Sequence, residues 1–201
     1  MCGIVGICNF FNKPNKEIVK LMNKALHHRG PDDEGYFNNE TISFGHKRLS
    51  ILDIKNSRQP MIDKTNGNIL IYNGEIYNFE KIKLELRNLG YVFETNGDTE
   101  VILKAYDYWG TECLNKFEGM FAFAIWDNKK KHLFIARDKF GEKPFFYTYL
   151  DEYGFIFSSE IKSFIKVGEI KKNLKIDYSS LNTYLSLNYL VADKTFFKEV
   201  Y

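Results

Sequence analysis

The stretch that decides the fold lies in the second half of the chain, where residues 119–159 read GMFAFAIWDNKKKHLFIARDKFGEKPFFYTYLDEYGFIFSS. Apolar and aromatic residues dominate four segments of it, and polar runs such as 127–130 and 151–154 separate them. The pattern predicts four strands joined by turns, over 120–127, 131–137, 145–150 and 155–159. Sequential strands with such short turns must pair antiparallel, because parallel neighbours need long crossovers.

Helices and further strands precede this stretch. Apolar residues at helical spacing predict helices over 18–26, 79–89 and 98–109. Strands are expected at 3–10, 36–37, 42–44 and 68–72. Residues 47–68 show little periodicity, and loops this long tend to be functional. Strands and helices come in separate runs, which indicates an α+β fold rather than alternating α/β.

Composition excludes several classes of partner. The 201 residues carry a net charge of +2, and this near-balance argues against nucleic acid or an anionic membrane. No segment approaches the roughly 18 consecutive apolar residues of a membrane span. The three cysteines lack CxxC spacing, so neither a disulfide framework nor a metal site is expected. The chain is predicted to be cytoplasmic.

Cys2 directly follows the initiator methionine. Removal of Met1 would place an α-amine of pKa roughly 7.7–8.0 beside a thiol of roughly 8.5. That amine could take the thiol proton and later deliver it to a leaving nitrogen. The alternative is a cysteine that only packs at the start of a strand, which from position alone is the commoner case.

Five motifs occur in a fixed order along the chain. They are MCGIVGI (1–7), HRGPDDEG (28–35), GHKRLSI (45–51), YNGEIYN (72–78) and GDTE (97–100). Together they resemble the class II glutamine amidotransferases, which are N-terminal-nucleophile (Ntn) hydrolases. The second and fourth motifs, with ARDKFGEKPFFY (136–147) and SSEIK (158–162), are similar to asparagine synthetases that hydrolyse glutamine. The resemblance covers essentially the whole chain.

The resemblance implies a fold and a domain organisation. The expected fold is a four-layer α-β-β-α sandwich of two mostly antiparallel sheets. Residues 2–190 would form the glutaminase domain, and 191–201 would lead into an ATP-dependent synthetase domain that this chain lacks. No cofactor is expected for the glutaminase domain, whereas ATP and Mg²⁺ would belong to the synthetase domain. The implied partners are L-glutamine and that domain, and a homodimer of the full-length protein is compatible with the resemblance.

The resemblance also implies catalytic roles. The Cys2 thiolate would attack the side-chain carboxamide of glutamine, giving a γ-glutamyl thioester and ammonia. The Asn73 amide and the Gly74 backbone N–H would stabilise the oxyanion, where losing one donor typically costs about 10²–10³ in rate. The alternative is that Asn73-Gly74 is only a tight turn after a strand.

Substrate binding is implied for a further set of residues. Arg48 would clamp the α-carboxylate bidentately, with a surface arginine as the alternative. Asp98 would bind the α-amino group, and helix N-capping explains an aspartate there equally well. The complete implied set is Arg48, Leu49, Ile51, Glu75, Gly97 and Asp98. Arg29 could organise its glycine-proline loop, and His46 is expected to be structural.

Two other functions stay open from the sequence. A related amidotransferase could serve another acceptor, in polysaccharide or natural-product assembly. A non-catalytic docking module would keep the fold without the activity.

Overall fold

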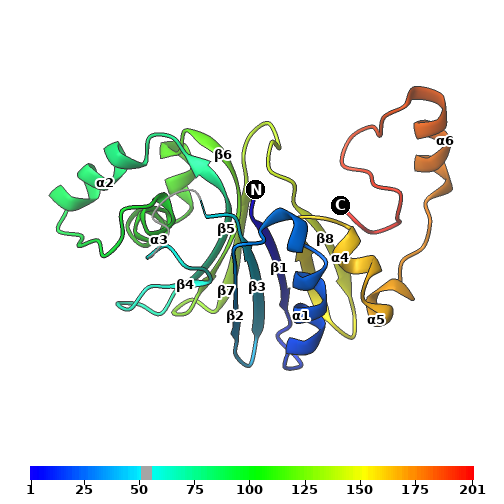
Figure 1. Ribbon diagram of the computed structural model, residues 1–201, viewed down its shortest axis with the longest axis horizontal. Helices are drawn as coiled ribbons and strands as arrows, with labels where there is room; N and C mark the ends of the chain where they lie inside the picture. The colour runs from blue at the N-terminus through cyan, green and yellow to red at the C-terminus, as the bar shows by residue number, and fades with distance from the viewer. Residues whose placement is uncertain (51–55) are drawn as a thin grey trace.

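The structure, a computed structural model, describes residues 1–50 and 56–201. Two antiparallel sheets form its centre (Figure 1). The five-stranded sheet has the order β2-β3-β1-β9-β8, and the four-stranded sheet has the order β4-β5-β6-β7. The strand bounds are β1 Gly3–Cys8, β2 Asp33–Asn38, β3 Ile42–Arg48, β4 Met61–Ile62, β5 Ile69–Ile76, β6 Gly119–Asp127, β7 His132–Arg137, β8 Phe146–Leu150 and β9 Gly154–Ser158.

Helices cover the outer face of each sheet. Figure 1 shows α2 and α3 beside the four-stranded sheet, and α1 and α4 beside the five-stranded one. The helices are α1 Lys16–Lys24, α2 Phe79–Asn88, α3 Asp98–Trp109, α4 Lys162–Ile165, α5 Gly168–Lys171 and α6 Tyr178–Leu187, with 3₁₀ turns η1 His27–Arg29 and η2 Gly110–Lys116.

Three apolar clusters separate four layers. The central cluster joins Ile4 and Phe44 of one sheet to Ile71 and Trp126 of the other. A second cluster packs α2 and α3 on the four-stranded sheet, and a third packs α1, α4 and α5 on the five-stranded sheet. Each sheet therefore buries both faces, which explains the continuous apolar character of β1. The predicted four-layer sandwich is confirmed.

β1 places the N-terminus inside the sandwich. This strand lies between β3 and β9, with Gly3 opposite Lys47 and Val5 opposite Ser158. Gly6 is required at its centre, because an added Cβ would lie 2.4 Å from the Phe157 ring. Cys2 immediately precedes the strand and therefore meets the end of β3.

Two predicted strands end four residues too early. β5 continues to Ile76, so Asn73-Gly74 is strand and not a turn, with Gly74 opposite Phe121 of β6. β3 runs to Arg48 instead of ending at residue 44, because it pairs with β1 on one side and β2 on the other. In both cases pairing with neighbouring strands overrides the polar local sequence.

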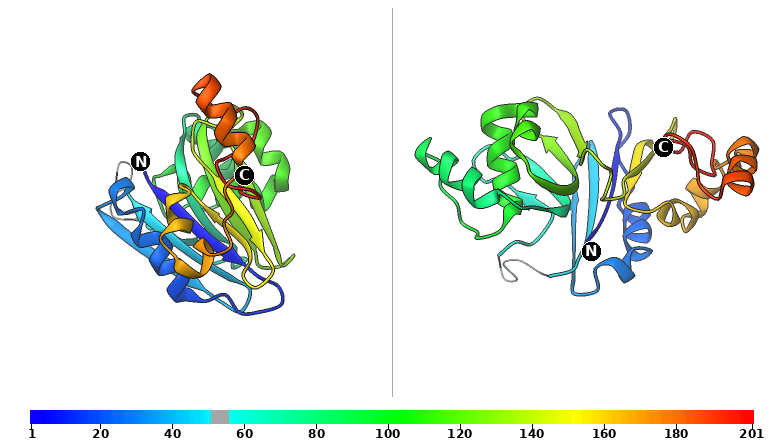
Figure 2. Two further views of the ribbon diagram at one scale, coloured as in Figure 1. Left: turned by 90° about the vertical axis from the view of Figure 1, so that its right-hand side faces the viewer. Right: turned by 90° about the horizontal axis from the view of Figure 1, so that it is seen from above.

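The C-terminal segment returns to the sandwich after an outlying helix. Figure 2 shows α6 at one end of the molecule, away from both sheets. Beyond it, Val200 pairs with Thr148, and the Tyr147 N–H donates to the Tyr201 carbonyl at 2.8 Å. The proposed domain limit at residue 190 stays a prediction. Among the described residues, no helix has the length and apolar character needed to cross a membrane.

Candidate active site

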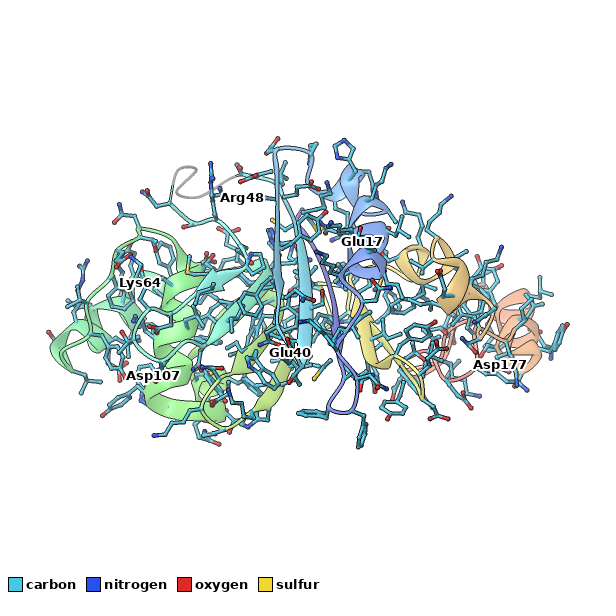
Figure 3. The ribbon with its side chains drawn as sticks, turned by 90° about the horizontal axis from the view of Figure 1, so that it is seen from below. Glu17, Glu40, Arg48, Lys64, Asp107 and Asp177 are labelled. Carbon is cyan, nitrogen blue, oxygen red and sulfur yellow. The ribbon has the colours of Figure 1, made fainter. Side chains whose placement is uncertain are left out.

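A cavity of about 150 Å³ lies where the N-terminus meets the ends of β3 and β5. Residues from widely separated parts of the sequence line it. The predicted site residues among them are Cys2, Arg48, Leu49, Asn73, Gly74, Glu75 and Asp98. In Figure 3 the labelled Arg48 lies between the half of the molecule that carries Glu17 and the half that carries Lys64.

Cys2 is partly exposed at the start of β1. Its Sγ lies 3.4 Å from the Leu49 backbone nitrogen and 3.6 Å from the Leu49 carbonyl oxygen. Burial raises the pKa of the thiol, while the Leu49 N–H and the positive charges of the N-terminus, Arg48 and Arg29 pull it down. Because the net shift is upward, the thiol needs a base to become a nucleophile.

Two cavity residues, Asn73 and Ser57, each have a buried side-chain atom without a hydrogen-bond partner among the described residues, and Asn73 is the one whose free atom is a strong donor. Its side chain is 1% exposed, and its Nδ2 has no hydrogen-bond partner among the described residues. An unsatisfied buried donor costs about 1–3 kcal/mol, so a ligand oxygen is the natural partner. The amide stands on β5, in the wall of the cavity that Cys2 also lines.

The direction of the Gly74 N–H follows from its neighbours. On the same edge of β5, the Tyr72 N–H donates to Gln59 Oε1 at 2.6 Å and the Ile76 N–H donates to Asp98 Oδ2 at 3.0 Å. Alternate residues of a strand point their N–H groups to the same side, so the Gly74 N–H points to the same edge of β5 as those of Tyr72 and Ile76. A side chain is excluded here, because a Cβ would lie 2.3 Å from the Met120 carbonyl oxygen.

Asp98 turns away from the helix that it begins. The N-cap of α3 is Gly97, and no side chain caps this end of the helix. The Asp98 carboxylate instead accepts hydrogen bonds from the Tyr72 hydroxyl at 2.7 Å and the Ile76 N–H. Burial raises the pKa of this carboxyl, and these donors oppose the rise. The N-cap interpretation of Asp98 is therefore wrong, and Gly97 does not line the cavity.

Arg48 is 5% exposed, so the surface-arginine interpretation is also wrong. It ends β3 at the cavity wall, and Glu75 of β5 lines the same cavity. Ile51 lies outside the described residues.

His46 is fully buried on β3. Its Nε2 donates to the Tyr72 carbonyl at 3.1 Å, which defines the neutral tautomer. Burial lowers its pKa to about 4. The neutral ring holds β3 against β5, and this is the structural role expected for it.

Several cavity residues were not predicted as site residues. Tyr72 and Gln59 organise Asp98 and the edge of β5, while Lys143, 6% exposed, donates to Met1 Sδ at 3.5 Å. Tyr72 lies within the fourth motif, which was the available signal. Lys143 lies within the motif at 136–147 and Gln59 within the long segment 47–68, so the sequence had marked both stretches without assigning these residues to the site. Among residues 1–50 and 56–201, no group of three acidic, histidine or cysteine side chains could hold a metal ion.

Comparison with solved structures defines the class of fold. Glutamine phosphoribosylpyrophosphate amidotransferase from B. subtilis superposes with a TM-score of 0.70 at 21% identity, over 83% of this chain and 44% of that one. A second solved structure, an allosteric regulatory enzyme of purine biosynthesis, gives a TM-score of 0.68. At these identities the likeness concerns the fold alone, which is that of the Ntn amidotransferases.

Sequence comparison identifies the family. Residues 1–201 match the model of the glutamine amidotransferase domain, and the chain belongs to this family. Asparagine synthetase [glutamine-hydrolyzing] 1 of Bacillus subtilis is 40% identical over 97% of this chain. A putative asparagine synthetase [glutamine-hydrolyzing] 2 of Methanocaldococcus jannaschii is 42% identical over the whole of it. The chain spans only 31% and 42% of these two relatives.

Proposed function

We propose that this chain hydrolyses L-glutamine to glutamate and ammonia, with Cys2 as the nucleophile. The observation that carries the proposal is the unsatisfied Asn73 amide in the cavity that holds the Cys2 thiol. A buried donor beside a nucleophile is what a tetrahedral oxyanion requires. Membership of the glutamine amidotransferase family supports the choice of substrate.

The first step is activation of the thiol. Removal of Met1, which itself lines the cavity, would expose the α-amine of Cys2. Because burial raises the thiol pKa, this amine must accept the proton as the Sγ attacks the carboxamide carbon. The Sγ–C bond forms and the carbonyl π electrons move to oxygen. The resulting oxyanion accepts hydrogen bonds from Asn73 Nδ2 and the Gly74 N–H.

Collapse of this intermediate releases ammonia. The C–N bond breaks, the α-ammonium returns its proton to the leaving nitrogen, and a γ-glutamyl thioester remains on Cys2. The same amine then activates water, which cleaves the thioester to glutamate and restores the thiol. No other side chain need act as a base, and His46 is unsuitable because its pKa is about 4 and its ring is fully buried with its Nε2 donating to the Tyr72 carbonyl of β5.

Separate residues of the cavity lining are proposed to bind the α-carboxylate and the α-ammonium group of glutamine. Arg48 presents a guanidinium suited to the α-carboxylate, with the Leu49 backbone beside it. Asp98 and Glu75 supply acceptors for the α-ammonium. The Tyr72 hydroxyl holds the buried Asp98 carboxylate in place, which favours a fixed binding position for the substrate α-ammonium group. Gly97 and Ile51 complete the proposed substrate-binding set.

The ammonia is proposed to supply an ATP-dependent asparagine synthetase domain. The two relatives, about two to three times the length of this chain and named as asparagine synthetases, support this acceptor. ATP and Mg²⁺ are assigned to that domain and no cofactor to this one. The full-length protein is proposed to be cytoplasmic and compatible with a homodimer, with neither nucleic acid nor membrane as partner.

The decisive experiment combines mass and activity. A chain lacking Met1 should gain one adduct from a glutamine-like diazo-ketone, and Cys2→Ala should abolish both labelling and ammonia release. A processed chain that neither takes the label nor releases ammonia from glutamine would contradict the proposal and favour the docking module. A full-length protein that releases ammonia but makes no asparagine with ATP would favour another acceptor.

A further inference from the structure

A charged cluster lies next to Cys2, just beyond the end of β9. Its centre is Glu160, two residues after the end of β9. Glu160 Oε1 lies 3.0 Å from Arg29 Nη1 and 2.9 Å from His28 Nε2, and Oε2 lies 3.7 Å from Lys162 Nζ. The proposed chemistry uses none of these four side chains.

Arg29 connects this cluster to the nucleophile. Its Nε donates to the Cys2 carbonyl oxygen at 2.8 Å, while its Nη1 donates to Glu160. The side chain is 8% exposed, so one rigid guanidinium joins the two groups in a protected environment. A planar fork can hold both contacts at once, which a lysine ammonium on a flexible stem does less well.

Cys2 has few other restraints. It precedes Gly3, the first residue paired in β1, and removal of Met1 would leave no chain on its other side. The next anchor is at Ile4, whose N–H donates to Ser159 Oγ at 3.0 Å and whose carbonyl accepts from the Ser159 N–H at 2.8 Å. Residues 159 and 160 therefore hold the start of the chain at two successive points.

We propose that Glu160 is a positioning residue, which acts through Arg29 on the Cys2 carbonyl to fix the orientation of the thiol and the α-amine. The inference rests on the proposed glutaminase function. Fixing the carbonyl fixes the Cys2–Gly3 peptide plane, and with it the direction from which the Cα of Cys2 presents its two reactive groups. A misplacement of about 1 Å at such a centre can cost about 10²-fold in rate.

The ionisation of Glu160 is consistent with this role. Burial would raise the pKa of its carboxyl, but hydrogen bonds and charges from Arg29 and His28 outweigh burial and hold the pKa below its ordinary value. The carboxylate is therefore charged at neutral pH. Hydrogen bonds between two charged groups are stronger than neutral ones, which favours a single orientation of Arg29.

The test is a double-mutant cycle on the chain lacking Met1. Glu160→Gln keeps the shape of the side chain and removes its charge. Arg29→Lys keeps the positive charge and removes the planar guanidinium that contacts Cys2 and Glu160 together. Each should lower kcat for glutamine about 10- to 100-fold, with KM changed by less than about threefold. The double variant should be no slower than the slower single one, because both act through one contact.

Controls separate positioning from loss of folded protein. Rates are divided by the amount of Cys2 that a diazo-ketone labels at completion, so that misfolded chains do not count. Glu169→Gln makes the same charge change on the exposed face of α5 and should retain the parent rate. If Glu160→Gln folds poorly, Glu160→Asp replaces it in the test. This variant keeps the charge on a shorter side chain, and its kcat should lie between that of the parent chain and the reduction of about 10- to 100-fold expected for Glu160→Gln.

The outcomes are distinct. An active parent chain whose Glu160→Gln variant keeps the parent kcat would overturn this inference alone. Multiplicative effects of the two substitutions would also overturn it, because Glu160 would then act independently of Arg29. A processed parent chain that releases no ammonia would instead overturn the glutaminase function, and the positioning role with it.

Discussion

Two buried polar groups on either side of β6 differ in how completely they are bonded. On one side, Asn73 in the cavity wall keeps an amide nitrogen without a partner among the described residues. On the other side, the Asp138 carboxylate accepts backbone N–H groups from Phe121, Phe140, Glu142 and Lys143. Both side chains are almost fully buried.

The difference distinguishes a residue that can bind a ligand from a residue that only organises the fold. Asp138 has satisfied its acceptors within the chain, so it organises the corner between β7 and β8 and has no unmet need for a ligand. Asn73 retains a donor directed into a cavity, which is an arrangement that a substrate oxygen can complete. The two are linked, because Asp138 binds the N–H of Phe121, the residue opposite Gly74.

The largest expected effect is at the nucleophile. Cys2→Ala should lower glutamine hydrolysis by more than about 10³-fold, since no other thiol lines the cavity among the described residues. Thermal unfolding should change little, because Cys2 is partly exposed and precedes β1. An ammonia-release assay and a melting curve measure the two. Retention of hydrolysis would move the chemistry away from Cys2.

The next effect tests the unsatisfied donor. Asn73→Ala should lower kcat by about 10²–10³-fold. Stability should stay within about 1 kcal/mol or improve slightly, because the lost amide had an unpaired nitrogen. Steady-state kinetics and urea unfolding measure both. A variant that unfolds easily but keeps its kcat would make Asn73 a structural residue and remove the contrast with Asp138.

Asp138→Asn should produce the opposite result. The amide cannot replace a carboxylate that accepts several N–H groups, so the free energy of unfolding should fall by about 2–3 kcal/mol. The kcat per folded molecule should change far less than it does for Asn73→Ala. Urea unfolding with active-site labelling measures both quantities. A selective loss of kcat at unchanged stability would place Asp138 in the chemistry.

The smallest effect is a pH dependence of stability from His46. Its folded pKa of about 4 lies below the ordinary value of 6.5, so between these values the unfolded chain binds more protons. The neutral His46 ring contributes its full stability above pH 6.5, and this contribution is lost as the pH falls toward 4. The loss in the free energy of unfolding amounts to about 2 kcal/mol at pH 5. Urea unfolding at pH 7 and pH 5 should show a smaller loss for His46→Gln. Equal losses in both proteins would exclude His46 as the source.

The site was partly accessible to sequence reasoning. The motifs predicted Cys2, Arg48, Asn73 and Asp98, and the structure brings these four around one cavity. Their assigned roles stay predictions. The local interpretations were less successful, because a tight turn at Asn73 and an N-cap at Asp98 are what short-range patterns favour. In the structure, antiparallel pairing extends β5, and the Tyr72 hydroxyl draws the Asp98 carboxylate inward.

By itself, the sequence determined the α+β class, the family and the chemical character of an N-terminal cysteine. Each depends on residue types at short spacing or on ordered motifs, which the chain carries without folding. Only the tertiary structure decided which polar groups remain unsatisfied and what restrains Cys2. Arg29 and Glu160 are 131 residues apart, and their contact exists because β9 packs beside β1. Hydrogen-bond satisfaction is a property of the packed interior, so it appears only when distant segments meet.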